Sequence, residues 1–508
     1  MGSGRWLRML ALVAAFSLLW ATPALAGVIG WVKIDGSKVD PGEAISPKPN
    51  NTVRIDVYLN EAPVSLRIGN QDVTVSQGTY AYSVPKYLLR PGTNAVNISA
   101  RTAGGSETRK YTVTYLDMPL AGAEFYLPDV SRVTKQTMFG GAASLNLGKD
   151  TYLMESDGDV PADQSLTVSV AAERPAKAPR GFAGVSPIFA VDPVPTGVTK
   201  FSRPGQLVLK FQGGMAPGAL PYALTVFRSP DSDFGDEDNV NLGGRVDARK
   251  GTVTVPLAEG IEGYYAVFSA VAMFKEFTDP SAGLGWAYHA AYPLWVKGIM
   301  EQYYGTAGGS TNPWEYATLT GNNDTYLGLV AGVSTTQVNT CRGEFAVLVV
   351  KALGIAPVNV AAGEYSFADL DNDASASREY ADQYGGYLEA AGRYGIVVGY
   401  PPGGSGQKPE FRALTTLDRE QAATIVARVA NLRIETDPDR VDAALQKAFS
   451  DASSISPWCR PYVLAAYRAG LVKGIPEGGG FKFAPGAYIT RAEAAQLIYN
   501  FMNKMRLL

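Results

Sequence analysis

The second half of the chain repeats one pattern three times, and this repeat restricts the possible folds more than any other feature. Each copy opens with Phe-x-Asp, at Phe277 to Asp279, Phe367 to Asp369 and Phe449 to Asp451. A helical segment then ends in a glycine that suits a left-handed C-cap, and a second helical segment follows a variable loop. The repeat predicts three similar helical units, at 275–355, 365–434 and 447–508.

The second helix of each copy begins with a four-residue motif whose second residue is arginine. The motifs are Cys341-Arg342-Gly343-Glu344, Asp418-Arg419-Glu420-Gln421 and Thr490-Arg491-Ala492-Glu493. Their first and fourth residues predict capping boxes in the second and third copies, while Cys341 is a weaker cap. Capping does not explain the arginine, because a cation in the first turn faces the positive end of the helix dipole.

Two interpretations account for the arginine at this position. In the first, the N–H groups of the helix, its dipole and the guanidinium fork together hold a carboxylate or phosphate. In the second, each arginine pairs with an aspartate of its own fold, namely Asp279, Asp369 or Asp451.

The repeat resembles the S-layer homology (SLH) domain of bacterial cell-surface proteins. The hallmarks are the opening Phe-x-Asp, a Trp near the start of the first helix, the Gly-Ile turn and the Thr-Arg-Ala-Glu motif, which is intact at 490–493. The resemblance covers 275–508. It implies a pseudo-threefold prism of three copies whose grooves bind pyruvylated secondary cell-wall polymer, with the motif arginine taking the ketal carboxylate.

The resemblance implies a set of ligand-binding residues. They are Arg342, Arg419 and Arg491, with Trp286, Trp458, Asp279, Asp369 and Asp451 as groove partners. The second copy departs from the pattern, because Gln383 stands where the Trp aligns and Tyr380 lies nearby, so the groove built on the third copy fits the family best. His289, on the first helix of copy one, is expected to be a packed or surface side chain.

Residues 27–274 have the pattern of short β-strands. Val53, Ile55, Val57 and Leu59 alternate with polar residues, which is the period of a strand with one buried face. Similar runs recur between Gly, Pro and Asn clusters. We expect an immunoglobulin-like sandwich at 27–116 and a second β domain at 117–274. The expected fold class is therefore N-terminal all-β sandwich domains followed by an α-helical SLH prism.

The N-terminus has the pattern of a secretory signal peptide at 1–26. Arg5 and Arg8 precede an apolar run from Met9 to Trp20, and Ala24 and Ala26 are the small residues that a signal peptidase requires. We therefore expect a secreted protein. A membrane anchor is the less favoured alternative, because the apolar run is shorter than a membrane span. No later stretch approaches the length of a membrane span, so no membrane association is expected after cleavage.

Composition weighs against enzymatic function. The chain has one His and two Cys, which removes most zinc and nucleophile chemistry, although carboxylate pairs for glycoside hydrolysis are not excluded by counting. The net charge of −3 provides no basic excess for nucleic acid. The acidic run Asp231 to Asp238 is either a solvated turn or a calcium site. Cys341 and Cys459 are candidates for a disulfide in an exported protein. No cofactor or metal is expected.

These observations predict a secreted cell-envelope protein, in or associated with an S-layer, that SLH domains hold to the cell wall. Self-assembly into a surface lattice is a possible consequence. The alternative is an SLH-anchored adhesin or polysaccharide-binding protein, and less favoured is an SLH-anchored glycoside hydrolase. Fold-level similarity of the β domains does not decide among them.

Overall fold

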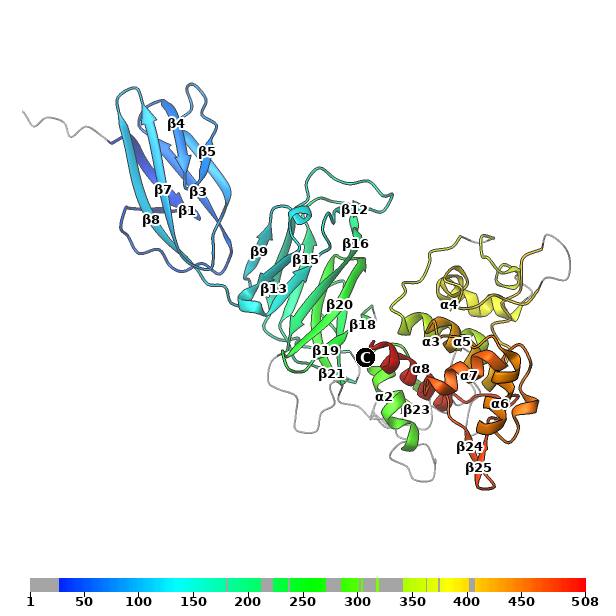
Figure 1. The fold of residues 1–508 in the computed structure, drawn as a ribbon. Helices are drawn as coiled ribbons and strands as arrows, with labels where there is room; N and C mark the ends of the chain where they lie inside the picture. Colours follow the sequence, from blue (N-terminus) through cyan, green and yellow to red (C-terminus); the bar gives the residue numbers. More distant parts are fainter. Residues whose placement is uncertain are drawn as a thin grey trace, which may run out of the picture. The chain divides into compact units, whose positions relative to one another are not determined.

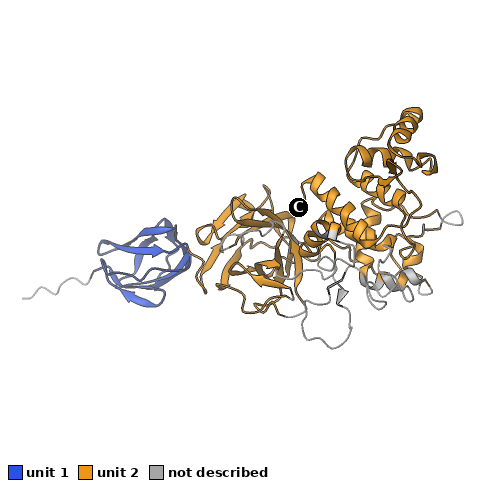
Figure 2. Ribbon diagram, turned by 90° about the horizontal axis from the view of Figure 1, so that it is seen from below, with its two compact units in different colours: residues 1–117 blue, residues 118–508 orange. Residues whose placement is uncertain are grey.

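The computed structural model describes residues 27–508 apart from 180, 212–222, 236–237, 271–284, 301–302, 305–316, 319–340, 362, 373–374 and 402–406. The chain divides into two compact units, residues 1–117 and 118–508 (Figure 2). Within the described ranges, no helix is long and apolar enough to cross a membrane.

The first unit contains two antiparallel sheets around one hydrophobic core (Figure 1). Its strands are β1 (Ile29–Ile34), β2 (Ser37–Val39), β3 (Thr52–Leu59), β4 (Pro63–Ile68), β5 (Gln71–Val73), β6 (Ala81–Leu88), β7 (Gly92–Thr102) and β8 (Ser106–Tyr115). The sheets have the orders β2-β1-β3-β6 and β5-β4-β7-β8. Alternate residues of β3 are buried, from Val53 to Leu59, as the sequence period predicts.

The second unit begins with two larger antiparallel sheets. Their strands are β9 (Glu124–Leu127), β10 (Lys135–Met138), β11 (Ala143–Asn146), β12 (Leu153–Glu155), β13 (Leu166–Ala172), β14 (Phe182–Gly184), β15 (Ile188–Pro193), β16 (Val198–Lys210), β17 (Leu224–Ser229), β18 (Val240–Gly243), β19 (Arg245–Asp247), β20 (Thr252–Glu259) and β21 (Gly263–Ala270). One sheet has the order β10-β11-β16-β20-β19, with β12 also on β16. The other has the order β18-β17-β21-β15-β13-β9, with β14 on β21. The inward side chains of both sheets share one core.

Helices make up the rest of the second unit. They are α2 (Tyr288–Val296), α3 (Arg342–Ala352), α4 (Ala376–Arg393), α5 (Arg419–Val429), α6 (Pro438–Ala448), α7 (Arg460–Arg468) and α8 (Arg491–Met505), with 3-10 turns η5 (Gly285–Ala287), η6 (Ala368–Leu370) and η7 (Ala452–Ser454) and a hairpin of β24 (Ile475–Glu477) and β25 (Gly480–Lys482). Their apolar faces form one continuous core. Gly298, Gly395 and Gly470 have φ of 68°, 68° and 75°, so each ends its helix in the left-handed conformation predicted for it.

The helical core continues into the adjoining β domain. The ring of Trp295, at the end of α2, lies 5.0 Å from the ring of Phe182 in β14. Asn241 in β18 donates from Nδ2 to the carbonyl of Val296 at 2.9 Å. Lys297 is buried at this junction, and its Nζ donates to the carbonyl of Leu224 at 2.8 Å. The helical region and the second β domain therefore pack as one body.

The predicted fold class is confirmed: sandwich-like antiparallel sheets come first, and a helical region follows. The opening Phe277 to Asp279 of the first copy lies outside the described residues.

Candidate functional site

The arginine motifs lie at the N-termini of α3, α5 and α8, as predicted. In each helix the capping side chain accepts the N–H three residues on: Cys341 Sγ from Glu344 (3.5 Å), Asp418 Oδ1 from Gln421 (2.8 Å) and Thr490 Oγ1 from Glu493 (3.2 Å). Only at α8, among these three helices, does the fourth residue complete the capping box, with Glu493 Oε2 accepting the N–H of Thr490 at 2.9 Å.

The other first-turn N–H groups of α3 and α5 are used within the protein. They donate to carbonyls in the loop of the following segment: Arg342 to Thr415 (2.8 Å), Gly343 to Ala413 (2.7 Å), Arg419 to Ala487 (3.0 Å) and Glu420 to Pro485 (3.2 Å). These N–H groups are not available to an anion. The backbone part of the predicted anion site is therefore absent at α3 and α5, and only the guanidinium groups stay candidates.

Two of the three arginines pair with the fourth motif residue of another segment. Arg491 Nε lies 2.7 Å from Glu344 Oε1, and Arg419 Nη1 lies 3.2 Å from Glu493 Oε1. Arg491 is only 1% exposed, so this pair lies inside the protein. The arginine of the second motif thus pairs with the third motif, and the arginine of the third motif pairs with the first. By this cyclic order, the expected partner of Arg342 is the fourth residue of the second motif.

That residue is Gln421, so the cycle of ion pairs is interrupted at Arg342. The guanidinium of Arg342 lies 4.9 Å from the ring of Tyr400 and 5.9 Å from the ring of Phe411. Its Nε is buried and has no hydrogen-bond partner among the described residues. Burial lowers the pKa of Arg342 from its usual value, with the nearby Arg428 acting in the same direction. Tyr400 and Asp369 act in the opposite direction, but no carboxylate of the described residues forms an ion pair with Arg342 to offset the loss of water.

Arg342 lines a groove with a cavity volume of about 210 Å³. Tyr400, Gln421, Arg428 and Trp458 also line it, and its described lining contains no carboxylate. The indole of Trp458 is 57% exposed. This groove, which we call the Arg342 groove, thus combines two cations with exposed aromatic surface.

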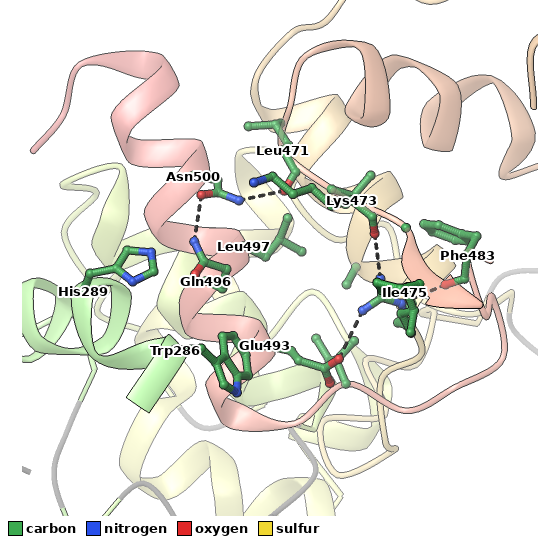
Figure 3. Close-up of a pocket in the computed structure, with 16 residues that line it drawn as sticks. Trp286, His289, Leu471, Lys473, Ile475, Phe483, Glu493, Gln496, Leu497 and Asn500 are labelled. Carbon is green, nitrogen blue, oxygen red and sulfur yellow. Dashed lines mark hydrogen bonds and ion pairs between the residues drawn. The ribbon is translucent and has the colours of Figure 1, made fainter. Parts of the chain in front are cut away.

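Arg419 lines a larger pocket of about 730 Å³ together with Trp286, Lys473 and Glu493 (Figure 3). Its donors are engaged, because Nε donates to the carbonyl of Phe483 at 2.9 Å and Nη2 to that of Lys473 at 3.2 Å, in addition to the Glu493 pair. Figure 3 shows His289 and Trp286 on one side of this pocket and Lys473, in the segment that leads into β24, on the other. His289 is exposed and lies edge-on to Tyr499 at 5.6 Å, consistent with a surface side chain.

The described motif aspartates bond to backbone N–H groups and form no ion pair with a motif arginine, while their implied role as groove partners stays a prediction. Asp369 accepts the N–H groups of Phe411 and Arg412 at 2.6 and 2.8 Å. Asp451 accepts those of Phe483 and Ala484 at 2.7 Å each. Both carboxylates fix the loop that precedes the second helix, and neither contacts a motif arginine. Asp279 and the side chains of Tyr380 and Gln383 lie outside the described part of the structure.

The predicted disulfide is wrong. Cys341 and Cys459 are both free thiols. Cys341 caps α3, and burial raises the pKa of each thiol to about 12. Neither cysteine therefore ionises readily at neutral pH.

The acidic run in the second β domain contains a salt bridge. Asp233 pairs with Lys177 and also accepts the N–H of Gly235 at 2.9 Å, and these contacts lower the pKa of Asp233. In the described part of the chain, no group of three or more His, Cys, Asp or Glu residues is placed to hold a metal ion. Residues 236–237 of the run are outside that part.

Sequence reasoning missed several residues of the grooves. Tyr400 and Arg428 belong to no motif that was singled out. Glu344 was considered only as a motif residue, and Glu493 only as part of a capping box. The signal that could have found the partner of Arg342 was present, because the fourth motif residue is Glu in two copies and Gln in one.

Residues 448–495 match the family described as the S-layer homology domain. They form one S-layer homology domain. It contains Asp451, Trp458 and the Thr490 to Glu493 capping box described above. The domain implies binding to a cell-wall polymer and a location at the cell surface. The first two copies of the repeat stay a prediction.

Two curated proteins are similar to part of the chain. An amylopullulanase of Thermoanaerobacterium thermosulfurigenes is 27% identical over 267 residues, which are 52% of this chain and 11% of that protein. The exoglucanase XynX of Acetivibrio thermocellus is 29% identical over 180 residues, 35% of this chain and 14% of that one. The chain thus spans a small part of the length of these relatives.

Among solved structures, the Bacteroides ovatus protein SGBP-B in complex with a mixed-linkage heptasaccharide is similar at 13% identity, with a TM-score of 0.12. The alignment covers 46% of this chain and 63% of SGBP-B.

Proposed function

We propose that this chain is a wall-anchored surface protein whose helical region binds a carboxylate-bearing cell-wall polymer in the Arg342 groove. The carrying observation is the buried Nε of Arg342, which has no hydrogen-bond partner among the described residues and lies in a groove lined by a second arginine and no acid. A planar carboxylate matches the guanidinium fork and supplies the missing counter-charge.

The comparison of the arginines supports this choice of groove. Arg491 and Arg419 each have a glutamate from another segment, and a ligand carboxylate would have to displace it. Arg342 has Gln421 in the corresponding place. Trp458 and Tyr400 offer apolar faces beside the cation, which suits a sugar ring that carries an acidic substituent.

The finer parts of the proposal rest on the S-layer homology domain and on the repeat. We propose three S-layer homology copies, a signal peptide that directs export, and pyruvylated secondary cell-wall polymer as the ligand. The names of the relatives, an amylopullulanase and an exoglucanase, favour a role with polysaccharides for the β domains over a lattice-forming one. Since the matched regions are small parts of those enzymes, we propose that this chain itself is a binding protein without catalytic activity.

The first test introduces a glutamate at position 421, where the cycle of ion pairs has no acid. In the full chain, Gln421→Glu should give Arg342 the partner that Arg491 and Arg419 already have, and it should weaken binding to purified wall polymer roughly ten- to a hundredfold. Gln446→Glu on the exposed face of α6 is the matched control, because it makes the same charge change outside the grooves. It should bind as the unchanged chain does.

A second pair of variants tests whether binding requires the guanidinium fork of Arg342. Arg342→Lys should fail almost as badly as Arg342→Ala, because an ammonium has charge but no planar pair of donors. Thermal unfolding of every variant separates lost binding from lost folding. Normal polymer binding by Gln421→Glu, in a folded protein, would show that the Arg342 groove is not the site.

A further inference from the structure

The second β domain has a basic trough on its outer sheet face, separate from the helical grooves. It has a cavity volume of about 790 Å³ and is lined by β10, β11, β16, β19 and β20 and by two residues at the end of α8, Arg506 and Leu508. We call this surface the sheet trough. Inward residues of these strands, such as Leu145 and Val253, pack in the core, so the trough is made by the alternate, outward residues.

The trough has a neutral polar floor. The strand register places Asn146 opposite Gln206, Ser144 opposite Val208, and Val208 opposite Thr254. The amides of Asn146 and Gln206 are therefore neighbours, and Val208 lies between the hydroxyls of Ser144 and Thr254. The Oδ1 atom of Asn146 is buried without a hydrogen-bond partner among the described residues, so the floor contains an unused acceptor.

Cations stand at both edges of this floor. Lys135 lies on the edge strand β10, and Arg245, Arg249 and Lys250 lie on and after β19 at the opposite edge. Arg506 is a fifth cation in the lining. Asp247 is the acidic side chain there, and Lys250 Nζ lies 3.3 Å from its Oδ2, which together with backbone N–H donors lowers its pKa.

The separation of the two cationic edges restricts the ligand. Four strand spacings separate β10 from β19, or about 19 Å along the sheet. A single small anion cannot contact both edges, so the trough fits an extended polyanion. Among the described residues, the lining contains no aromatic side chain on which bases can stack, which disfavours single-stranded nucleic acid. Hydroxyl and amide groups between the cations are instead the partners that sugar hydroxyls require.

We infer that the sheet trough is a second binding site, for an acidic polysaccharide whose carboxylates reach the arginines and lysines at the two edges and whose hydroxyls bond to the floor. This site is independent of the Arg342 groove. It gives the β domain a ligand of its own, on a rigid sheet whose floor residues are held in register by β11, β16 and β20.

The experiment uses the full chain and polygalacturonate as the probe, with neutral dextran and single-stranded DNA as comparison polymers. We expect binding to polygalacturonate that weakens with added salt, since exposed charges are screened. The double variant Arg245→Gln/Arg249→Gln should bind at least tenfold more weakly. Asn146→Leu should also weaken binding, at unchanged net charge.

Matched controls separate this site from general charge and from the groove. Arg132→Gln/Arg203→Gln removes two arginines of the same domain outside the trough and should bind as the unchanged chain does. Gln421→Glu should leave polygalacturonate binding intact, while Arg245→Gln/Arg249→Gln should leave wall-polymer binding intact. Equal loss in both arginine pairs, equal binding of dextran, or a preference for DNA would each overturn the inference.

Discussion

The motif arginines differ in environment although they occupy the same position of the same motif. Arg491 and Glu344 are both almost completely buried and 2.7 Å apart. Two charges that have lost their water depend on each other, and removing one partner leaves the other as an uncompensated buried charge. Arg342 lines a groove whose described lining contains no carboxylate. Removing Arg342 therefore leaves no acid of that groove without a partner.

Arg491→Met should therefore lower the free energy of unfolding by about 3–5 kcal/mol. Adding Glu344→Leu should recover much of this loss, because apolar residues of similar size replace both charges. Arg342→Met should lower the free energy of unfolding by no more than about 1 kcal/mol, because the lost contacts with the Tyr400 and Phe411 rings are partly offset by the removal of a desolvated cation. Denaturant unfolding of the full chain measures all three. A small effect of Arg491→Met would show that Glu344 finds water or another partner when the arginine is gone.

At this scale the sequence predicts local contacts well and distant ones poorly. The caps of Asp418 and Thr490 follow from neighbouring residues, and the structure confirms them. The partner of Arg491 is 147 residues away in the chain, so no local pattern could identify Glu344. The motif aspartates Asp369 and Asp451 were expected near arginines because attraction of opposite charges was considered and their backbone donors were not.

The end of α2 contacts the second β domain, and this contact includes a buried lysine. Lys297 directly follows α2 and is buried among residues of both parts, and its Nζ donates to the carbonyls of Leu224 and Gly244. Burial lowers the pKa of Lys297 to about 7. An unfolded lysine has a pKa of about 10.4, so the unfolded chain binds more protons than the folded one between these values.

Stability of the second unit should therefore rise as the pH increases from about 7 to about 10, and the contribution of Lys297 should be constant and unfavourable below pH 7. Lys297→Met should flatten this rise, because methionine fills the site without a proton to bind. Thermal unfolding midpoints at several pH values between 7 and 10 test this. Lys447→Met, on the exposed face of α6, is the control and should keep the slope. Parallel slopes for both variants would contradict a neutral buried lysine.

Secondary structure was predictable because it depends on periods within the sequence. The alternation in β3 and the glycine that ends each helix are examples. The strand order β2-β1-β3-β6 depends on pairing between distant segments, which alternation does not encode. The sheet trough was missed for the same reason, since its floor is assembled from three strands that are separated in the chain.

The second unit shares a core across the predicted boundary at 274. Trp295 contacts Phe182, and Ala223 of the β domain belongs to the helical cluster. Cutting the chain at 274 would expose this apolar surface and the buried Lys297. The division between the two compact units falls instead at 117.

We therefore expect residues 118–508 to fold as a stable fragment and to sediment with wall material that retains its polymer. Residues 275–508 alone should be less stable and more prone to aggregate, because exposed core surface associates with itself. Residues 27–117 should fold without sedimenting. Circular dichroism and sedimentation of the three fragments provide the measurements. If 275–508 matches 118–508 in unfolding midpoint, the shared core contributes little.

The donation of first-turn N–H groups to the next loop has a consequence for synthesis. A chain is made from its N-terminus, yet α3 needs the carbonyls of Ala413 and Thr415, and α5 needs those of Pro485 and Ala487. The first turn of each of these helices therefore forms its hydrogen bonds only after a later segment has been translated. The first turns of α3 and α5 are therefore completed only after Thr415 and Ala487, respectively, have been synthesised.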